Sequence, residues 1–252
     1  MLAVLSLLAG AAATASLRLL RGSLEQRAQQ QLERLLVAMI GGAESESHGY
    51  LGDMGELPDT DLLQLLVRGS QTPGVQSSVD GVISGYAGPY LLDPVDTSRG
   101  FLDPWGSPVA YTPGSAQVRS AGPDRTLATD DDIVHPLAPA KVSGTITVVV
   151  RGIPLGGQPA LALRSDEATV EVVITRASDN GRALQSVTYT GAPGAGVWLT
   201  DAPVHSGLHS VIVTGADATG AGGRSYVGAV AHVLVEVRGT PAFVTVTLDE
   251  QG

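Results

Sequence analysis

The chain has 252 residues, which is enough for one large domain or two of ordinary size. Hydrophobic residues make up 43% of it and charged residues 16%, which excludes a disordered acidic chain. The absence of cysteine excludes a disulfide framework, a cysteine-ligated zinc site and a thiol nucleophile. The formal net charge of −10 argues against nucleic-acid binding, because binding phosphate needs a basic surface.

The negative charge is concentrated in the middle of the chain. Residues 1–17 carry no charged side chain. Residues 44–140 contain 14 acidic residues and 4 arginines, and this difference accounts for the whole net charge. Residues 141–252 are close to balance, with 9 acidic and 7 basic residues.

The N-terminal residues predict one long helix of about 40 residues, roughly 60 Å in length. Residues 1–17 are apolar or small, and we expect this half to be a transmembrane segment. A cleaved signal peptide is the alternative, although no basic residue precedes the apolar run. The second half is amphipathic, and Gly41-Gly42 ends it. Its apolar stripe comprises Leu17, Leu20, Leu24, Ala28, Leu32, Leu35, Leu36 and Met39.

The middle of the chain predicts short elements separated by turns. Asp59 is a candidate cap for a short helix over 60–68. Residues 109–111 and 117–119 predict two strands around a turn at Pro113-Gly114. An acidic loop follows over 120–132, and residues 137–140 have the composition of a linker.

The C-terminal residues predict an all-β domain. Thr169–Thr175 is rich in β-branched residues, and Asp179-Asn180-Gly181 is a turn signal between two strands. Strands at this spacing favour a single antiparallel β-sandwich. The expected strands are 143–151, 159–164, 168–176, 184–190, 196–200, 208–215, 226–237 and 242–248.

Residues 1–133 resemble the type IV pilin superfamily, and most closely the major pseudopilin of type II secretion systems. After the long helix come a Tyr-Leu-Gly…Pro segment over 49–58 and a short Leu-rich helix. Residues 103–111, Asp-Pro-Trp-Gly-Ser-Pro-Val-Ala-Tyr, are similar to a motif of that family. The family endings Ser-x-Gly-x-Asp and Asp-Asp-Ile have counterparts at 120–124 and 131–133.

Two features depart from the pilin pattern. The basic leader, the Gly cleavage site and the Phe-Thr-Leu-x-Glu start of the mature pilin are not in this sequence. We expect either a misassigned start or a protein that is not processed as a pilin. The second departure is a tail of about 110 residues, which resembles a carboxypeptidase regulatory-like or transthyretin-like β-sandwich in residues 196–213 and 242–248.

The acidic loop is the candidate metal site. Calcium takes six to eight oxygen ligands from carboxylates and backbone carbonyls, and the resemblance implies calcium in this loop. The alternative is a solvated turn whose carboxylates cap backbone N–H groups. The candidate ligands are Ser120, Asp124, Asp130, Asp131 and Asp132.

Other motifs suggest structure and no catalysis. Asp103-Pro-Trp-Gly106 has the composition of a turn in which Trp105 packs onto the sheet. His205 and His209 are four residues apart, but Gly207 interrupts any helix between them, so exposed turn or strand positions are expected. There is no nucleophile elbow and no nucleotide fingerprint, so we expect no enzyme.

These observations together predict an α+β fold in three parts. They are a transmembrane and amphipathic helix over 1–42, a pilin-like α+β head over 43–140 and an Ig-like or transthyretin-like sandwich over 141–252. The expected function is a structural subunit of a type II secretion pseudopilus or type IV pilus-like filament. Its expected partners are copies of itself, other pseudopilins and the inner membrane, with no nucleic acid. An unknown protein or glycan would bind the sandwich.

The expected location is the bacterial inner membrane, crossed once, with the globular part in the periplasm or on an extracellular filament. An alternative of another class stays open. It is a membrane-anchored or exported adhesion or binding module that uses the sandwich and does not polymerise.

Overall fold

The computed structural model describes two compact units of the chain. The first unit comprises Met1–Val37, Asp59–Leu63 and Leu91–Ala140, and the second comprises Ala38–Pro58, Gln64–Tyr90 and Lys141–Gly252. The residues outside the description are 1, 43–47, 60–61, 78–80, 93–99, 141, 154–155, 157–158, 160, 163–168, 179–180, 190–196, 200–202, 217–229, 238–240 and 250–252. The division has a boundary after Ala140, where one was predicted, whereas Ala38–Pro58 and Gln64–Tyr90 fall in the second unit together with the C-terminal strands.

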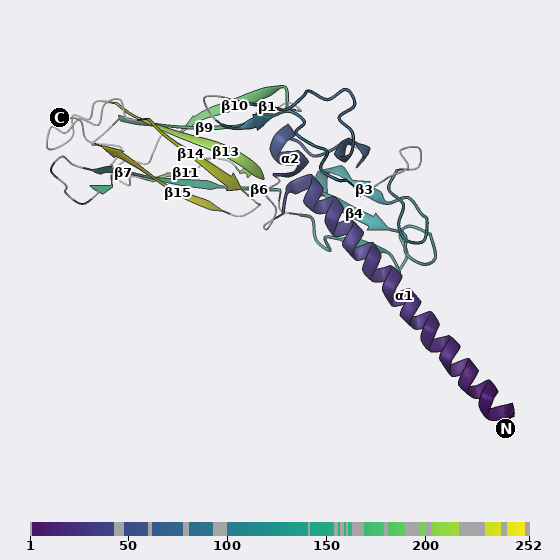
Figure 1. Ribbon diagram of the computed structural model, residues 1–252. Coiled ribbons are helices and arrows are strands. Elements are labelled where there is room, and N and C mark those ends of the chain that lie inside the picture. Colours follow the sequence, from purple (N-terminus) through teal and green to yellow (C-terminus); the bar gives the residue numbers. More distant parts are fainter. Residues whose placement is uncertain are drawn as a thin grey trace. The chain divides into compact units, whose positions relative to one another are not determined.

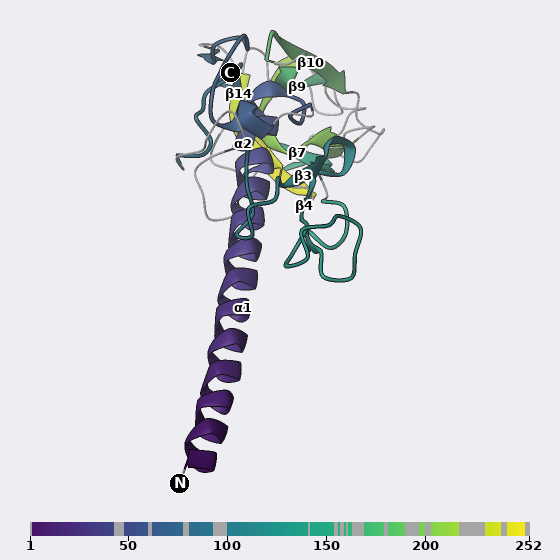
Figure 2. The same cartoon turned by 90° about the vertical axis from the view of Figure 1, so that its right-hand side faces the viewer.

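Helix α1, Leu2–Ile40, is one continuous helix (Figure 2). Its exposure changes along its length. Leu19 and Leu20 are 76% and 59% exposed, whereas Leu32 and Leu35 are almost fully buried. The buried side chains recur at spacings of three and four, which places them on one face of the helix. They are Ala28, Leu32, Leu35 and Met39.

The expected membrane segment is corrected by the structure. Among the residues that the structure describes, none of the helices combines the length and the apolar character needed to cross a membrane. The prediction of a single-pass protein of the bacterial inner membrane is therefore wrong.

The predicted α+β class is also wrong, because the described part of the chain is mostly β, with 37% in strands and 24% in helices. Its α-helices are α1 and the six-residue α2, Gly49–Met54. Where a Leu-rich helix was expected over 60–68, only the 3-10 turn η1, Leu62–Leu65, is described. Glycine and β-branched residues disfavour helix in much of the remaining sequence, which explains this balance.

The first unit contains a three-stranded antiparallel sheet in the order β3–β4–β5, of which Figure 1 labels β3 and β4. Its strands are β3, Ala110–Thr112, β4, Gln117–Ser120, and β5, Ile133–His135. The 3-10 turn η2, Pro113–Ser115, joins β3 to β4, which confirms the predicted pair of strands. Gln31 of α1 donates a 2.8 Å hydrogen bond to the carbonyl of Leu102. The helix is therefore tied to the loop that precedes the sheet.

The second unit contains two sheets that share a core. One has the order β10–β9–β13–β14, and the other has the order β11–β7–β15 with β8 paired to β7. Aliphatic side chains of β7, β9, β13 and β15 form one buried cluster, so the two sheets pack as a sandwich. The strands are β6, Ser143–Gly144, β7, Ile146–Ile153, β8, Leu161–Ala162, β9, Thr169–Ser178, β10, Ala183–Tyr189, β11, Val197–Leu199, β12, Val204–His205, β13, Gly207–Ala216, β14, Val230–Val237, and β15, Ala242–Asp249.

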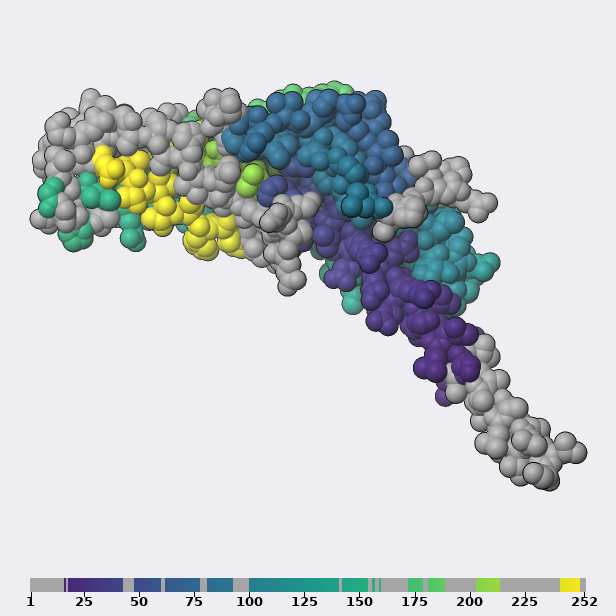
Figure 3. All heavy atoms as spheres, viewed as in Figure 1, coloured from purple at the N-terminus to yellow at the C-terminus, as the bar shows by residue number. Residues whose placement is uncertain are grey.

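All eight strands predicted for the C-terminal residues are present, but their pairing is not wholly antiparallel. β15 runs parallel to β7, with Ala242 opposite Ile146 and Leu248 opposite Gly152. Side chains of β15 alternate between buried and exposed, and Phe243 on the outer side is 76% exposed. Figure 3 shows the strand, in yellow, at the surface.

Helix α2 packs against β9 and β13, and strand β2, Ile83–Ser84, which pairs with β1, Val75–Gln76, packs against β9. Two glycines permit this close approach. A Cβ on Gly207 would lie 2.4 Å from the Cα of Gly52, and a Cβ on Gly181 would lie 2.3 Å from the Cα of Gly85. Both have positive φ, of 137° and 69°. Ser84 also donates 3.0 Å hydrogen bonds to carbonyls of the β9–β10 turn region.

Candidate functional site

The acidic loop of the first unit is held by hydrogen bonds within the chain. Ser120 is buried, and its Oγ donates a 2.7 Å hydrogen bond to Oδ2 of Asp103. The same Oγ accepts the N–H of Gly122. Ser120 therefore supports the base of the loop, whereas Asp130 is exposed at the other end.

Asp124 and Asp131 cap backbone groups of the loop. Oδ2 of Asp131 accepts the N–H of Asp124 at 3.0 Å, and its Oδ1 accepts the hydroxyl of Thr129 at 2.8 Å. The hydrogen bond from Thr129, followed by the N–H of Asp124, lowers the pKa of Asp131. Oδ1 of Asp124 accepts the N–H of Thr126 at 2.7 Å. These contacts are the capping pattern given above as the alternative to a metal site.

Asp132 differs from the other loop carboxylates. Its Oδ2 accepts hydrogen bonds from Nη1 of Arg119 at 3.1 Å and from the N–H of Ala128 at 2.8 Å. Its side chain is only 5% exposed, and its Oδ1 has no hydrogen-bond partner. Within the described ranges, however, no three or more His, Asp or Glu side chains come close enough together to hold a metal ion.

The Asp103-Pro-Trp-Gly segment forms a turn, as its composition predicts. Oδ1 of Asp103 accepts the N–H groups of Trp105 and Ser107 at 3.0 and 2.8 Å. The N–H of Gly106 closes the turn on the carbonyl of Asp103 at 2.9 Å, with a φ of 86° at the glycine. Asp103 is 4% exposed, so its carboxylate joins this turn to Ser120 from a buried position.

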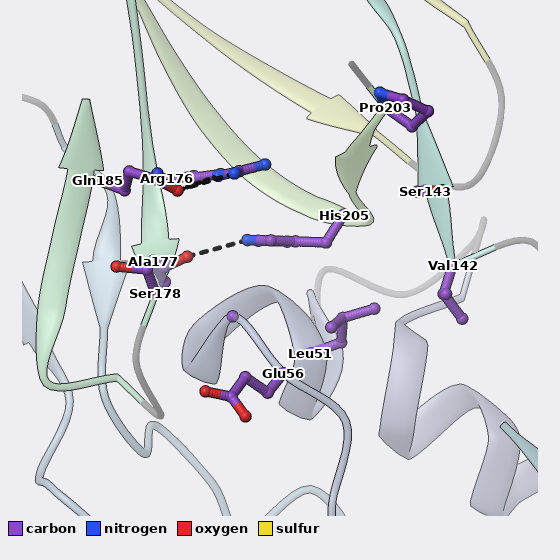
Figure 4. Close-up of a pocket in the computed structure, with 11 residues that line it drawn as sticks. Leu51, Glu56, Val142, Ser143, Arg176, Ala177, Ser178, Gln185, Pro203 and His205 are labelled. Atoms are coloured by element: carbon purple, nitrogen blue, oxygen red, sulfur yellow. Dashed lines mark hydrogen bonds between the residues drawn. The ribbon is translucent and has the colours of Figure 1, made fainter. Parts of the chain in front are cut away.

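The second unit contains a pocket of about 390 Å³ that sequence reasoning missed (Figure 4). It lies between the end of α2 and the strands β6, β9, β10 and β12. Apolar and polar groups both line it, including Leu51, Glu56, Val142, Arg176, Gln185 and His205. Its volume is within the range of sites for small ligands.

Arg176 is the basic side chain of this pocket, and Gln185 holds it in place. Nε and Nη2 of Arg176 donate to Oε1 of Gln185 at 3.0 and 2.7 Å. The two residues are direct cross-strand partners on β9 and β10. This contact fixes the plane of the guanidinium on the wall of the pocket.

His205 reaches into the pocket from β12, opposite Arg176 (Figure 4). Its Nε2 lies 2.9 Å from the carbonyl of Ala177, and its Nδ1 lies 2.9 Å from the carbonyl of Ser206. Burial, the largest cause, lowers the pKa of His205, although the hydrogen bonds to the carbonyls of Ser206 and Ala177 act in the opposite direction. The ring of His209 is 5.2 Å away and is fully buried, which corrects the expectation that both histidines are exposed.

A second polar cluster of the same unit surrounds Asp53 of α2. Asp53 is 5% exposed, and its Oδ2 accepts a 2.8 Å hydrogen bond from the hydroxyl of Tyr90. Burial raises the pKa of Asp53 to about 6, although the Tyr90 hydrogen bond and then the charge of His48 act in the opposite direction. Burial also raises the pKa of Tyr90, so its hydroxyl stays protonated as the donor. The rings of Tyr50 and Tyr86 lie edge-on to Tyr90.

Comparisons with known proteins give little guidance. No protein-family model matches the chain, and no curated protein sequence matches it. A DUF3823 family protein from Parabacteroides merdae is 16% identical with a TM-score of 0.25, over 43% of this chain and 47% of that structure. A leucine-rich repeat protein from Bacteroides thetaiotaomicron is 17% identical with a TM-score of 0.21, over 50% of this chain and 17% of that structure. The chain thus spans less than half the length of either structure, and neither similarity supports the resemblance to pilins.

Proposed function

We propose that the protein is a structural subunit of a pilus-like filament, related to the pseudopilins of type II secretion, and that it assembles through α1. The support comes from the change of exposure along α1. The apolar row that is buried at Leu32 and Leu35 continues toward the N-terminus as exposed Leu20 and half-buried Leu24. An exposed apolar row on a helix gains stability when it packs against a second helix.

The occupant that we propose for this row is α1 of another copy. Two rows of the same kind can pack against each other by ridges and grooves along their length. The head motif around Asp103 adds support, because it occurs in the order found in the pilin superfamily. Other copies of this chain and related subunits would be the partners, and no catalytic step is involved.

Replacing Leu20 with glutamate is expected to prevent assembly. The substitution places a charge in the row that would be buried between copies, and an unpaired buried charge is costly. The measurement is filament formation by electron microscopy, together with sedimentation of the full-length protein.

Gln26→Glu is the matched control, because it adds the same charge at an exposed position. At 100° per residue, residue 26 lies on the opposite side of the helix from the midpoint of residues 20 and 24. Unchanged assembly of Gln26→Glu and loss of assembly in Leu20→Glu would support the proposal. Filaments formed equally by both variants, or none formed by the wild type, would overturn it.

Calcium binding by the acidic loop is a separate proposal. It is supported by Oδ1 of Asp132, a buried carboxylate oxygen without a hydrogen-bond partner. Such an atom suits a hard cation, with Asp124 and backbone carbonyls as further ligands. A bound ion would stabilise the folded first unit by mass action.

Removing calcium with a chelator is therefore expected to lower the melting temperature of the wild type by several degrees. Asp124→Asn, which removes one charge from an exposed ligand, is expected to shrink that shift. Differential scanning calorimetry with and without EGTA measures both. An equal melting temperature in the wild type under the two conditions would show that the loop is a capped turn.

The alternative function is an exported binding module that does not polymerise. The observation that favours it is the pocket in the second unit, since a filament subunit needs none. A monomeric wild type in the sedimentation experiment, with a ligand in the pocket, would favour this alternative.

A further inference from the structure

We propose that the pocket of the second unit binds a single carboxylate carried on a short, partly apolar body of dipeptide size. The anchor is Arg176 on β9, and Gln185 on β10 positions it. The inference is independent of filament assembly, because every lining residue that the structure describes belongs to the second unit.

The orientation of Arg176 explains the choice of carboxylate. A guanidinium has five N–H donors in one plane, and the Nε–Nη2 edge of Arg176 is taken by Oε1 of Gln185. Among the residues that the structure describes, Gln185 is the only side chain that Arg176 binds, so the Nη1–Nη2 edge at the end of the side chain can face a ligand. The two donors of that edge match the two oxygens of a carboxylate in a bidentate pair.

The charge of the pocket sets the charge of the ligand. Among the lining residues that the structure describes, Arg176 is the only arginine or lysine, and Glu56 is an acid. Burial lowers the pKa of His205, which opposes a positive charge on its ring, although the carbonyls of Ser206 and Ala177 that face its ring nitrogens act in the opposite direction. The single guanidinium can neutralise one negative charge, whereas the second charge of a phosphate dianion would be repelled by Glu56.

The remaining wall of the pocket suits an apolar body. Leu51, Val142, Ala177 and Pro203 contribute apolar surface beside the guanidinium. A volume of about 390 Å³ is small for a drug-sized ligand and admits a body of about two residues. A peptide that ends in a free carboxylate and a peptide with an acidic side chain share this chemistry.

The test is an NMR titration of the full-length protein with three probes. They are N-acetyl-valyl-alanine with a free carboxylate, its C-terminal amide, and N-acetyl-glutamate α-amide. We expect saturable shifts of the Arg176 and His205 resonances with the free acid and none with the neutral amide. Shifts with the third probe would identify side-chain carboxylates as ligands as well, and their absence would restrict the site to chain termini.

Variants of Arg176 distinguish a specific binding site from nonspecific electrostatic attraction. Arg176→Gln is expected to weaken binding at least tenfold, and Arg176→Lys, which keeps the charge but not the planar edge, is expected to weaken it severalfold. Arg182→Gln is the matched control, because Arg182 is exposed at the β9–β10 turn and is not among the pocket residues. Thermal unfolding checks that each variant is folded. Equal binding of acid and amide, equal losses in Arg176→Gln and Arg182→Gln, or no binding by the wild type would overturn the proposal.

Discussion

Replacing Asp103 with alanine is expected to lower the free energy of unfolding of the first unit by about 4 kcal/mol, because it leaves three donors without their acceptor. These donors are the N–H groups of Trp105 and Ser107 and the hydroxyl of Ser120. Water cannot replace the carboxylate freely, since Asp103 and Ser120 are buried. This loss would be a large part of the stability of a small unit.

The measurement is urea unfolding followed by the fluorescence of Trp105 in a Trp198→Phe background, which confines the signal to the first unit. Asp103→Asn is the control, because it keeps one acceptor oxygen for the two N–H groups and should lose less than half as much. A Ser120→Ala variant completes a double-mutant cycle and gives the coupling of the two side chains. A loss below about 1 kcal/mol in Asp103→Ala would contradict the assigned role.

Replacing Asp53 with asparagine is expected to stabilise the second unit at pH 7 and to leave it almost unchanged at pH 4. The folded pKa of Asp53, about 6, is above its ordinary value of 3.8, so the folded state binds the proton more tightly than the unfolded state. The stability that protonated Asp53 contributes is therefore fully present below about pH 4 and is lost as the pH rises through about 6. The difference corresponds to about 3 kcal/mol at pH 7, from 1.36 kcal/mol per pKa unit.

The asparagine side chain of the Asp53→Asn variant would stay neutral at every pH and could still accept the hydrogen bond from Tyr90. The stability profile of this variant between pH 4 and 7 should be flatter than that of the wild type. The measurement is urea unfolding at four pH values, followed by Trp198 in a Trp105→Phe background. Asp249→Asn, which changes an exposed acid of β15, should keep the wild-type profile. Parallel profiles for Asp53→Asn and the wild type would refute the prediction.

The strands were predictable from sequence, and the packing of the segments before them was not. Alternation and β-branched residues located all eight C-terminal strands, and the Asn180-Gly181 turn located the β9–β10 hairpin. Helix α2 was missed because two of its six residues are glycine, which disfavours a helix. Gly52 is nevertheless suited to its place, since Gly207 lies against it. Such a tertiary contact cannot be read from local propensity.

The residues of the candidate sites were likewise predictable only in part. The acidic loop is contiguous in sequence, so its residues could be named in advance, but their hydrogen bonds depend on the fold. The pocket gathers residues from α2, β9, β10 and β12, which are far apart in the chain. One part of it had a signal, because the hairpin turn that was predicted sets Arg176 opposite Gln185. His205 and Glu56 gave no sequence signal that would bring them to the same place.

The order of the segments along the chain has a consequence for how the protein is made. Residues 91–140 of the first unit are inserted between two stretches of the second unit. Ser84 can therefore bind its partner only after 97 further residues have been synthesised, and β7 can pair with β15 only once the chain has reached Ala242–Asp249. The β3–β4–β5 sheet joins neighbours in sequence and can close earlier, because short loops cost less entropy. Folding on the ribosome is thus expected to finish the inserted unit before the unit that surrounds it in sequence.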